Sequence, residues 1–341
     1  YESSDYSEDG KVYTLQQASE GNGINVVLMG DAFSDRQIAD GTYEEVMRTA
    51  ADAFFSEEPY TSFRNLFNVY YVTAVSRNEG YVDGGSTAFS GYFGSGTHVG
   101  GDHNKCMQYA ATCPGMTDPL MNEVLIIVMM NSTTYAGTCY FGTSTAYQGD
   151  YGRGYGIAYF PIGTSDEDLA SVLHHEAGGH GFAKLLDEYY YESMGAIPSS
   201  EISDNINSRN LYGWGRNVDY TSDPNSVVWS KFISDSRYAN EGLGVYEGAC
   251  TYYKGAYRPT ETSIMVGNVG GFNAPSREAI YNRIHKLAYG ESWQFDYETF
   301  VSWDLSRQGR SRSISVGTEY KPTAPPVILN QHWKGGRLVA N

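Results

Sequence analysis

The chain has 341 residues, of which 41% are hydrophobic, so it can form a real core and is not a wholly disordered chain. Its 40 acidic residues against 23 lysines and arginines give a formal net charge of −17. Such a surface repels the phosphate backbone of a nucleic acid. The longest apolar run, Val124–Met130, is far shorter than the ~20 residues that cross a bilayer, so the sequence predicts neither a nucleic-acid partner nor a membrane span.

The first twenty residues are polar and acidic, which predicts an N-terminal lead-in over 1–20. The chain opens at Tyr1 without a basic stretch followed by an apolar one, so we expect no secretory signal within it. Its four cysteines form no C-x-x-C pair, which argues against a cysteine-ligated zinc site or a redox motif. Of the three possible disulfide pairings, Cys106 with Cys113 closes the shortest loop and is favoured, with free thiols as the alternative.

Strands and helices alternate between residues 20 and 190. Alternation of this kind is typical of an α/β fold. The third of four short apolar runs is the most apolar, which predicts a central strand, and Pro161 predicts a strand end or a sheet edge in the fourth. The expected strands are Ile24–Met29, Phe67–Val75, Val124–Met130 and Ile157–Ile162, with helices at Tyr43–Phe55 and Lys105–Ala111.

The clearest helix is expected at Ser165–Glu188. Ser165 is followed three residues later by Asp168, which is typical of a helix N-terminus, and an apolar stripe begins at Leu169. Residues 195–275 are rich in Gly, Asn, Ser and Tyr and show little periodicity. Ala279–Leu287 predicts one more short helix.

This pattern divides the chain into an upper subdomain at 21–190, an irregular lower subdomain at 191–306 and a polar C-terminal tail at 307–341.

Three of the seven histidines lie in the long helix, two of them flanking a glutamate and a glycine pair in His175-Glu176-Ala177-Gly178-Gly179-His180. A catalytic zinc needs three N or O ligands and an open position. The well-known helical solution is H-E-x-x-H, in which two histidines at i and i+4 share a face and the glutamate is a general base. Here the spacing is H-E-x-x-x-H instead.

Five residues of a regular α-helix turn about 500°, which leaves His175 and His180 about 140° apart. A local widening to a π-turn would bring them together, and such turns occur at functional sites. Gly178 and Gly179 lie where that turn must open. The alternative ligand set pairs Glu176 with His180 at i and i+4.

The stretch HEAGGHGFAKLLDEY, from His175 to Tyr189, resembles the signature of the M64 metallopeptidases, the IgA-peptidase-like family. In that family a helical His-Glu…His is followed by Leu-x-Asp-Glu-Tyr. Ile24–Phe33, Asn68–Gly80 and Gly248–Met265 agree with the resemblance, which covers most of residues 20–300.

The resemblance implies a zincin fold of metzincin type, with a twisted mixed sheet and the long active-site helix in the upper lobe. It implies Zn²⁺, with Asp187 as the third ligand beside the two histidines. A continuing helix would carry Asp187 about 10.5 Å beyond His180, so the helix must end soon after His180. Glu188 is an alternative ligand or a neighbour that orients a ligand. Ser263-Ile264-Met265 is similar to the metzincin Met-turn.

The expected function is therefore a zinc peptidase, of endopeptidase type by family resemblance, acting on extracellular polypeptides. A zinc-activated water attacks the peptide bond, Glu176 is the general base, and Tyr253 or Tyr257 stabilises the oxyanion. We expect a monomer located in the periplasm, on the cell surface or in the medium. The alternative is a non-catalytic carbohydrate- or protein-binding module with a structural metal.

Overall fold

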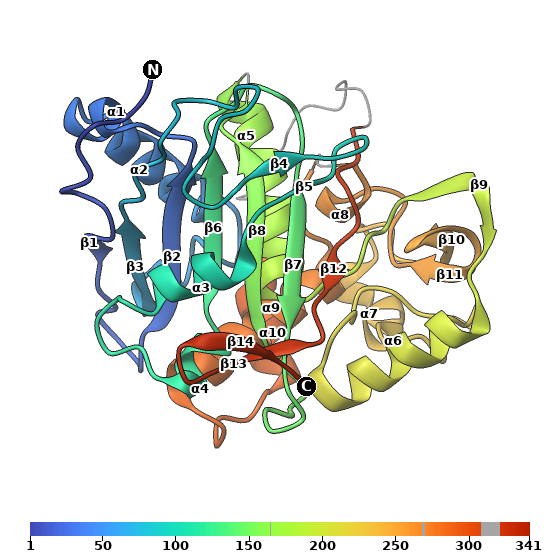
Figure 1. Cartoon of the computed structure of the whole chain (residues 1–341). Helices are drawn as coiled ribbons and strands as arrows, with labels where there is room; N and C mark the ends of the chain where they lie inside the picture. Colours follow the sequence, from blue (N-terminus) through green and yellow to red (C-terminus); the bar gives the residue numbers. More distant parts are fainter. Residues whose placement is uncertain (164, 268–269, 308–320) are drawn as a thin grey trace.

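The computed structural model describes residues 1–163, 165–267, 270–307 and 321–341, with only the backbone described at 166 and 167. The main sheet of these residues has seven strands in the order β1-β3-β2-β6-β8-β7-β12 (Figure 1). The four strands from β3 to β8 are parallel, β1 and β7 run antiparallel to their neighbours β3 and β8, and β12 pairs with β7 in parallel. The fold is thus α/β with a mixed sheet.

The main sheet is formed by short strands from both ends of the chain as well as its centre. Smaller sheets contain β10-β11-β9, β13-β14 and β4-β5. The strands are β1 Val12–Gln16, β2 Ile24–Asp31, β3 Phe67–Val72, β4 Tyr92–Phe93, β5 Val99–Gly100, β6 Leu125–Met130, β7 Thr138–Gly142, β8 Tyr155–Pro161, β9 Tyr190–Ala196, β10 Tyr246–Ala249, β11 Thr251–Arg258, β12 Val327–Ile328, β13 Gln331–Lys334 and β14 Arg337–Ala340.

Helices cover both faces of the main sheet, with α3 on one face and α2, α5 and α9 on the other (Figure 1). The α-helices are α1 Asp35–Ala39, α2 Thr42–Phe54, α3 His103–Ala110, α4 Asp118–Met121, α5 Asp166–Leu173, α6 Ser199–Tyr212, α7 Ser230–Ser234, α8 Ile264–Gly267, α9 Ala274–Tyr289 and α10 Tyr297–Arg307. Short 3₁₀ segments occur at η1 Arg64–Leu66 and η3 Ser236–Tyr238, and η2 His174–Phe182 is a π-helix.

The central strand β6 explains why both faces are covered. Its residues are all buried, and successive side chains point to opposite faces. Leu125, Ile127 and Met129 pack with the helices α2, α5 and α9, whereas Ile126 and Val128 pack with α3. A continuous apolar run, rather than an alternating one, is what a strand buried on both faces requires.

The four strands predicted from the apolar runs are confirmed as β2, β3, β6 and β8. Pro161 ends β8, which confirms the predicted strand end, whereas the alternative of a sheet edge is wrong because β8 lies between β6 and β7. The predicted helix Ser165–Glu188 is too long, because its helical part ends at Phe182.

The N-terminal lead-in, the C-terminal tail and the stretch 195–275 are predicted without strands or helices, but all three contain them. The lead-in carries β1, which pairs with β3, and the tail carries β12 in the main sheet and the hairpin β13-β14. Residues 308–320 of that tail lie outside the described residues. The weakly periodic stretch 195–275 includes α6 and a small sheet.

The favoured disulfide between Cys106 and Cys113 is not formed, and all four cysteines are free. The Cys106 thiol on α3 lies 3.4 Å from the Tyr159 hydroxyl instead. Burial raises the pKa of Cys113 to about 12, which keeps that thiol protonated and unreactive. Within the described residues, no helix is both long and apolar enough to cross a bilayer.

Candidate metal centre

The two histidines of the H-E-x-x-x-H segment lie side by side because the helix is widened there. Helix α5 continues directly into the π-helix His174–Phe182, which includes all six residues of the segment. The rings of His175 and His180 are 4.7 Å apart, centroid to centroid, instead of pointing about 140° apart. The π-turn predicted from the spacing is present.

The glycine pair serves close packing rather than a left-handed backbone, because neither glycine has a positive φ. A Cβ at Gly178 would lie 3.0 Å from the Tyr60 ring, whose hydroxyl donates to the Gly178 carbonyl at 2.5 Å. A Cβ at Gly179 would overlap the sulfur of Met265. The helix can therefore approach the 263–267 segment this closely only because Gly179 has no side chain.

We expect Gly179→Ala to destabilise the protein by about 1–3 kcal/mol, as overpacking of a filled core does. Met265 has no exposed surface and cannot move out of the way into solvent. Urea unfolding measures the loss. Combining Gly179→Ala with Met265→Ala removes the overlap, so its destabilisation should be smaller than the sum of the two single changes. Strict additivity would show that Gly179 and Met265 do not touch.

The helix ends at a turn made by a lysine. Lys184 has a φ of 56°, in the left-handed region that usually requires glycine. Its ammonium group is buried and donates to the carbonyls of Gly154 at 2.8 Å and Gly181 at 2.7 Å. These bonds satisfy a carbonyl of the last helical turn and hold the strained backbone in place. Burial lowers the pKa of Lys184 well below its usual value.

A second set of hydrogen bonds stabilises the reversal of the chain after the helix. Asn217 donates to the Leu186 carbonyl at 2.8 Å and accepts from the Leu186 amide at 2.9 Å. The Lys184 carbonyl accepts from the Gly215 amide at 2.8 Å. The reversal brings Asp187 to the two histidines, which a straight helix would place about 10.5 Å from the nearer one.

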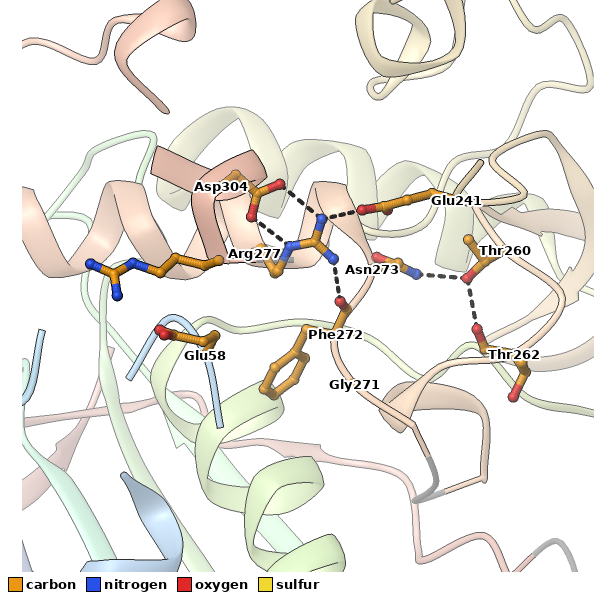
Figure 2. Close-up of a pocket in the computed structure, with 10 residues that line it drawn as sticks. Glu58, Glu241, Thr260, Thr262, Gly271, Phe272, Asn273, Arg277 and Asp304 are labelled. Carbon is orange, nitrogen blue, oxygen red and sulfur yellow. Dashed lines mark hydrogen bonds and ion pairs between the residues drawn. The ribbon is translucent and has the colours of Figure 1, made fainter. Parts of the chain in front are cut away.

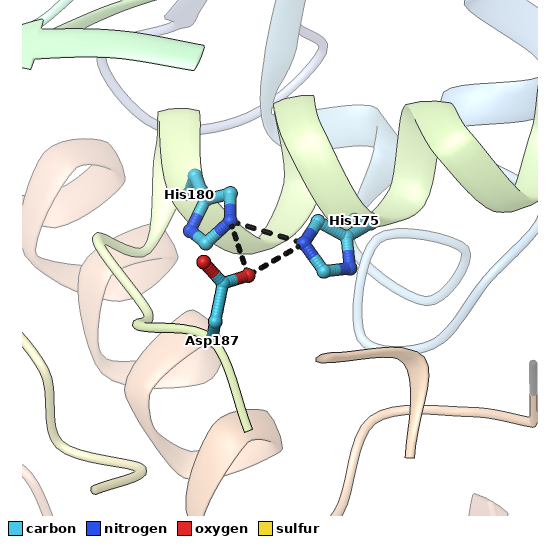
Figure 3. A group of neighbouring side chains, drawn as sticks. All are labelled: His175, His180 and Asp187. Carbon is cyan, nitrogen blue, oxygen red and sulfur yellow. Dashed lines mark hydrogen bonds and ion pairs between the residues drawn. The ribbon is translucent and has the colours of Figure 1, made fainter. Parts of the chain in front are cut away.

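Three ligand atoms converge at this point (Figure 3). Nε2 of His175 lies 3.0 Å from Nε2 of His180 and 3.0 Å from Oδ1 of Asp187, and His180 Nε2 lies 3.1 Å from the same oxygen. Tetrahedral zinc with bonds of about 2.0–2.1 Å holds its ligand atoms about 3.3 Å apart. The three ligand atoms would therefore have to move apart by only a few tenths of an ångström to accommodate the ion.

Backbone carbonyls fix the tautomers of both imidazoles. His175 Nδ1 lies 2.8 Å from the Ile264 carbonyl, and His180 Nδ1 lies 2.6 Å from the Leu185 carbonyl. A carbonyl oxygen can only accept, so each Nδ1 carries a proton and each Nε2 presents a lone pair. Two lone pairs and a carboxylate oxygen pointing at one spot repel unless a cation or a proton lies between them. The donor set therefore fits a metal ion.

Without a metal ion, a proton can reduce the repulsion between the atoms of His175, His180 and Asp187. Burial opposes the charge of His180, but Asp187 outweighs it and raises the pKa of His180 to about 9. Burial also works to raise the pKa of Asp187, and the charge and the hydrogen bond of the protonated His180 lower it instead. A metal ion would take the place of that shared proton.

Glu176 lies beside this group and is not part of it. Its side chain has no exposed surface, and neither carboxylate oxygen has a hydrogen-bond partner among the described residues. Burial raises the pKa of Glu176, against the opposing charges of His175 and His180. A buried carboxylate without partners is costly for stability and is typical of a functional site.

A sequence model of the family described as IgA peptidase M64 matches residues 13–237 of the chain. The match covers well over half of the sequence and includes the whole H-E-x-x-x-H segment and Asp187. The chain belongs to the M64 peptidase family. No curated protein sequence gives a significant match. M64 peptidases are metallopeptidases, and the three converging residues form a possible metal site in this member.

In this M64 peptidase Glu188 does not join the metal group. Its buried carboxylate accepts hydrogen bonds from Asn217 at 2.8 Å, Ser263 at 2.7 Å and Asn273 at 2.9 Å. These donors occupy both of its oxygens, so it connects three distant segments beneath the site. The expectation that Glu188 orients a histidine is not supported, because backbone carbonyls do so.

Met265, which the sequence predicts to belong to a Met-turn, packs against the widened helix at Gly179. It is buried, its sulfur faces Gly179, and its carbonyl accepts from the Glu188 amide at 2.8 Å. The preceding residue, Ile264, supplies the carbonyl that orients His175. The 263–267 segment thus supports the metal group from below.

The two tyrosines proposed to stabilise an oxyanion lie on β11, away from the metal group. The Tyr253 ring packs against Tyr190 and is 39% exposed. The Tyr257 hydroxyl lies 3.5 Å from Glu247. Among the described residues, neither forms a hydrogen bond or ring contact with His175, His180 or Asp187. The structure gives neither tyrosine a place in the site.

A cavity of about 320 Å³ lies at the N-terminus of α9 (Figure 2). Its central cation, Arg277, donates to Asp304 at 2.7 and 2.8 Å, to the Phe272 carbonyl at 2.7 Å and to Glu241. Neither the metal group nor Glu176 lines this cavity. We interpret the ion pairs of Arg277 with Glu241 and Asp304 at this cavity as structural.

Proposed function

We propose that this M64 peptidase is a zinc-dependent peptidase that hydrolyses peptide bonds of extracellular proteins, with Glu176 as general base. The observation that carries the proposal is the convergence of three acceptor atoms, from His175, His180 and Asp187, beside a buried carboxylate without partners. A bound zinc ion would supply a Lewis acid that polarises the scissile carbonyl and favours loss of a proton from water.

Glu176 has the properties of a general base. Its neighbours at the metal group are oriented by backbone carbonyls, so they do not compete for its oxygens. Its raised pKa brings it closer to the range in which a carboxylate can accept a proton and return it to a leaving amine. Its burial excludes bulk water, which strengthens electrostatic interactions with the reacting atoms.

The packing supports a metzincin-like arrangement. The helix with two ligands, the reversal to Asp187, and Met265 beneath the helix follow one another as that arrangement requires. We propose that residues 21–190 form the upper subdomain and 191–306 the lower one. The proposals of an endopeptidase, of a monomer and of a location outside the cytosol rest on the family resemblance and the composition alone.

A binding module with a structural metal is the weaker interpretation. A structural zinc normally has four protein ligands. In the described part of the chain, the metal group has three, and the Glu176 carboxylate lies close enough to feel the charges of His175 and His180.

The proposal is tested by removing the metal. We expect protein stripped with a chelator to lose hydrolysis of an unfolded polypeptide such as casein, and added Zn²⁺ to restore it. Mg²⁺ is the matched control and should not restore activity, because it prefers six oxygen ligands. Peptide release and bound metal are measured on the same samples. Hydrolysis that continues in fully stripped protein would contradict a metal-dependent mechanism.

A further inference from the structure

The last described part of the chain lies along the edge of the main sheet nearest to the metal site. Residues 321–329, which we call the covering segment, run beside β7 toward the C-terminal hairpin (Figure 1). Within it, β12 pairs with β7 in parallel, with Val327 opposite Tyr140. The covering segment begins 84 residues beyond the end of the family match.

Hydrogen bonds hold the covering segment from three sides. The Tyr135 hydroxyl donates to the Lys321 carbonyl at 2.7 Å, and the Tyr189 hydroxyl donates to the Thr323 carbonyl at 2.7 Å. On the sheet side, the Ala324 amide donates to the Gly137 carbonyl at 3.1 Å. The segment therefore lies between the sheet edge and the chain that follows Asp187.

Thr323 faces the proposed general base. A Cβ placed on Gly137 would lie 3.1 Å from Oε1 of Glu176, so the backbone that Ala324 joins passes directly over that carboxylate. The Thr323 hydroxyl works to lower the pKa of Glu176 against the effect of burial, although neither this hydroxyl nor a Glu176 oxygen has a hydrogen-bond partner of good geometry among the described residues. Thr323 is only 1% exposed. No residue among Glu176, His175, His180 and Asp187 is more than 2% exposed.

A polypeptide cannot reach a carboxylate that is covered in this way. We propose that the covering segment is an intramolecular inhibitory strand, which must leave the edge of β7 before a substrate can bind. This proposal rests on the proposed function. The displacing partner is an extended polypeptide that adds a strand to β7, which is a recurring mode of peptide recognition at the edge of a sheet.

The covering segment is suited to reversible binding. Prolines at 322, 325 and 326 have no amide proton, so they cannot donate to β7. Its pairing with β7 is parallel, which is slightly less stable per residue than antiparallel pairing. A substrate that pairs with β7 in the antiparallel direction can form a stronger ladder and displace it.

Thr323→Asp tests the proposal in the full chain, because it places a second carboxylate against Glu176. Two negative charges placed next to each other in a buried site repel, so the covering segment should leave. We expect at least tenfold faster hydrogen exchange of the Ala324 amide, which donates to Gly137, and of the Leu329 amide, which donates to Phe141 of β7. Bound zinc should be extracted by a chelator at least tenfold faster, and kcat/KM for casein peptides should rise at least tenfold.

Two controls separate charge from packing. Thr323→Val keeps the shape without adding charge, so the covering segment should stay in place, and hydrogen exchange and zinc extraction should match the wild type. Pro325→Asp adds the same charge at an exposed position and should also leave all three measurements unchanged. If Thr323→Asp fails to fold, Ala324→Pro serves instead, because it removes the donor to Gly137 without adding charge.

The outcomes distinguish this proposal from the proposed function. Faster exchange and zinc extraction with no hydrolysis in any protein would support the covering role and refute the peptidase. Faster exchange with kcat/KM and zinc extraction unchanged would overturn the inhibitory role and leave the peptidase intact. Wild-type protection in Thr323→Asp would show that Thr323 does not face Glu176, which overturns the proposal as well.

Discussion

Replacing Glu176 with Gln is expected to lower kcat/KM for peptide hydrolysis by about 10²–10⁴-fold, the usual contribution of a general base. The amide has the shape of the carboxylate but cannot accept the proton. Zinc should remain bound near one ion per chain, because the three converging ligand atoms belong to His175, His180 and Asp187. Steady-state kinetics and metal content, measured on the same preparation, check both parts.

The same change at Glu188 is the matched control. Both glutamates are buried, but Glu188 accepts from Asn217, Ser263 and Asn273, whereas Glu176 has no partner. Glu188→Gln would set an NH₂ group against these donors and should cost about 1–3 kcal/mol of stability. Glu176→Gln should cost none. Loss of zinc in Glu176→Gln would contradict its assignment as base and favour the ligand set of Glu176 with His180.

The parts of the fold that follow from local pattern could be predicted. The buried strands β2 and β6 come from uninterrupted apolar runs, and the π-turn follows from the five-residue spacing of His175 and His180 with two glycines between them. In each case the signal lies within a dozen residues. Burial on both faces determines the strands, and the rotation per residue determines the π-turn. Both causes act within the same dozen residues.

The reversal at Lys184 could not be predicted from local sequence. A left-handed backbone normally indicates glycine, and Gly181 lies in the wrong place for it. The lysine is tolerated because its ammonium group is bound by the carbonyl of Gly154, thirty residues earlier, as well as by that of Gly181. A hydrogen bond between residues thirty positions apart cannot be predicted from a short stretch of sequence around either residue.

The same reason explains why the contacts of Glu188 and the buried position of Thr323 could not be predicted. Glu188 follows Asp187 and is therefore predicted to be an alternative ligand or a neighbour that orients a ligand, but its partners come from positions 217, 263 and 273. Thr323 lies in a polar, proline-containing stretch that is typical of a tail. Short edge strands such as β12 are held by backbone hydrogen bonds to a neighbour rather than by an apolar face, so composition does not reveal them.

Replacing Asp187 with Ala is expected to lower zinc affinity by more than the about 10–100-fold that is typical of changes outside the ligand set. Its Oδ1 is the one anionic atom among the three that converge, lying 3.0 Å from His175 Nε2 and 3.1 Å from His180 Nε2. Without it, two neutral imidazoles must hold the ion alone. Asp187→Asn keeps the shape, loses the negative charge, and should weaken binding nearly as much.

Stability and metal binding must be measured separately for this change. In metal-free protein the Asp187 carboxylate is the partner of a protonated His180, whose pKa it raises to about 9 against the effect of burial. Asp187→Ala should therefore also destabilise the metal-free protein, because a buried charge loses its counter-ion. Urea unfolding without zinc measures the destabilisation of the metal-free protein, and zinc titration of the folded protein measures the zinc affinity.

Glu188→Ala is the comparison that decides the assignment. It removes a neighbouring buried carboxylate that touches none of the three ligand atoms, so its effect on affinity should stay within about 10–100-fold. The reversal at Lys184 makes this difference possible, since it presents Asp187 to the histidines and turns Glu188 toward Ser263. An Asp187→Ala protein that remains folded and binds zinc as tightly as Glu188→Ala would show that Asp187 is not the third ligand.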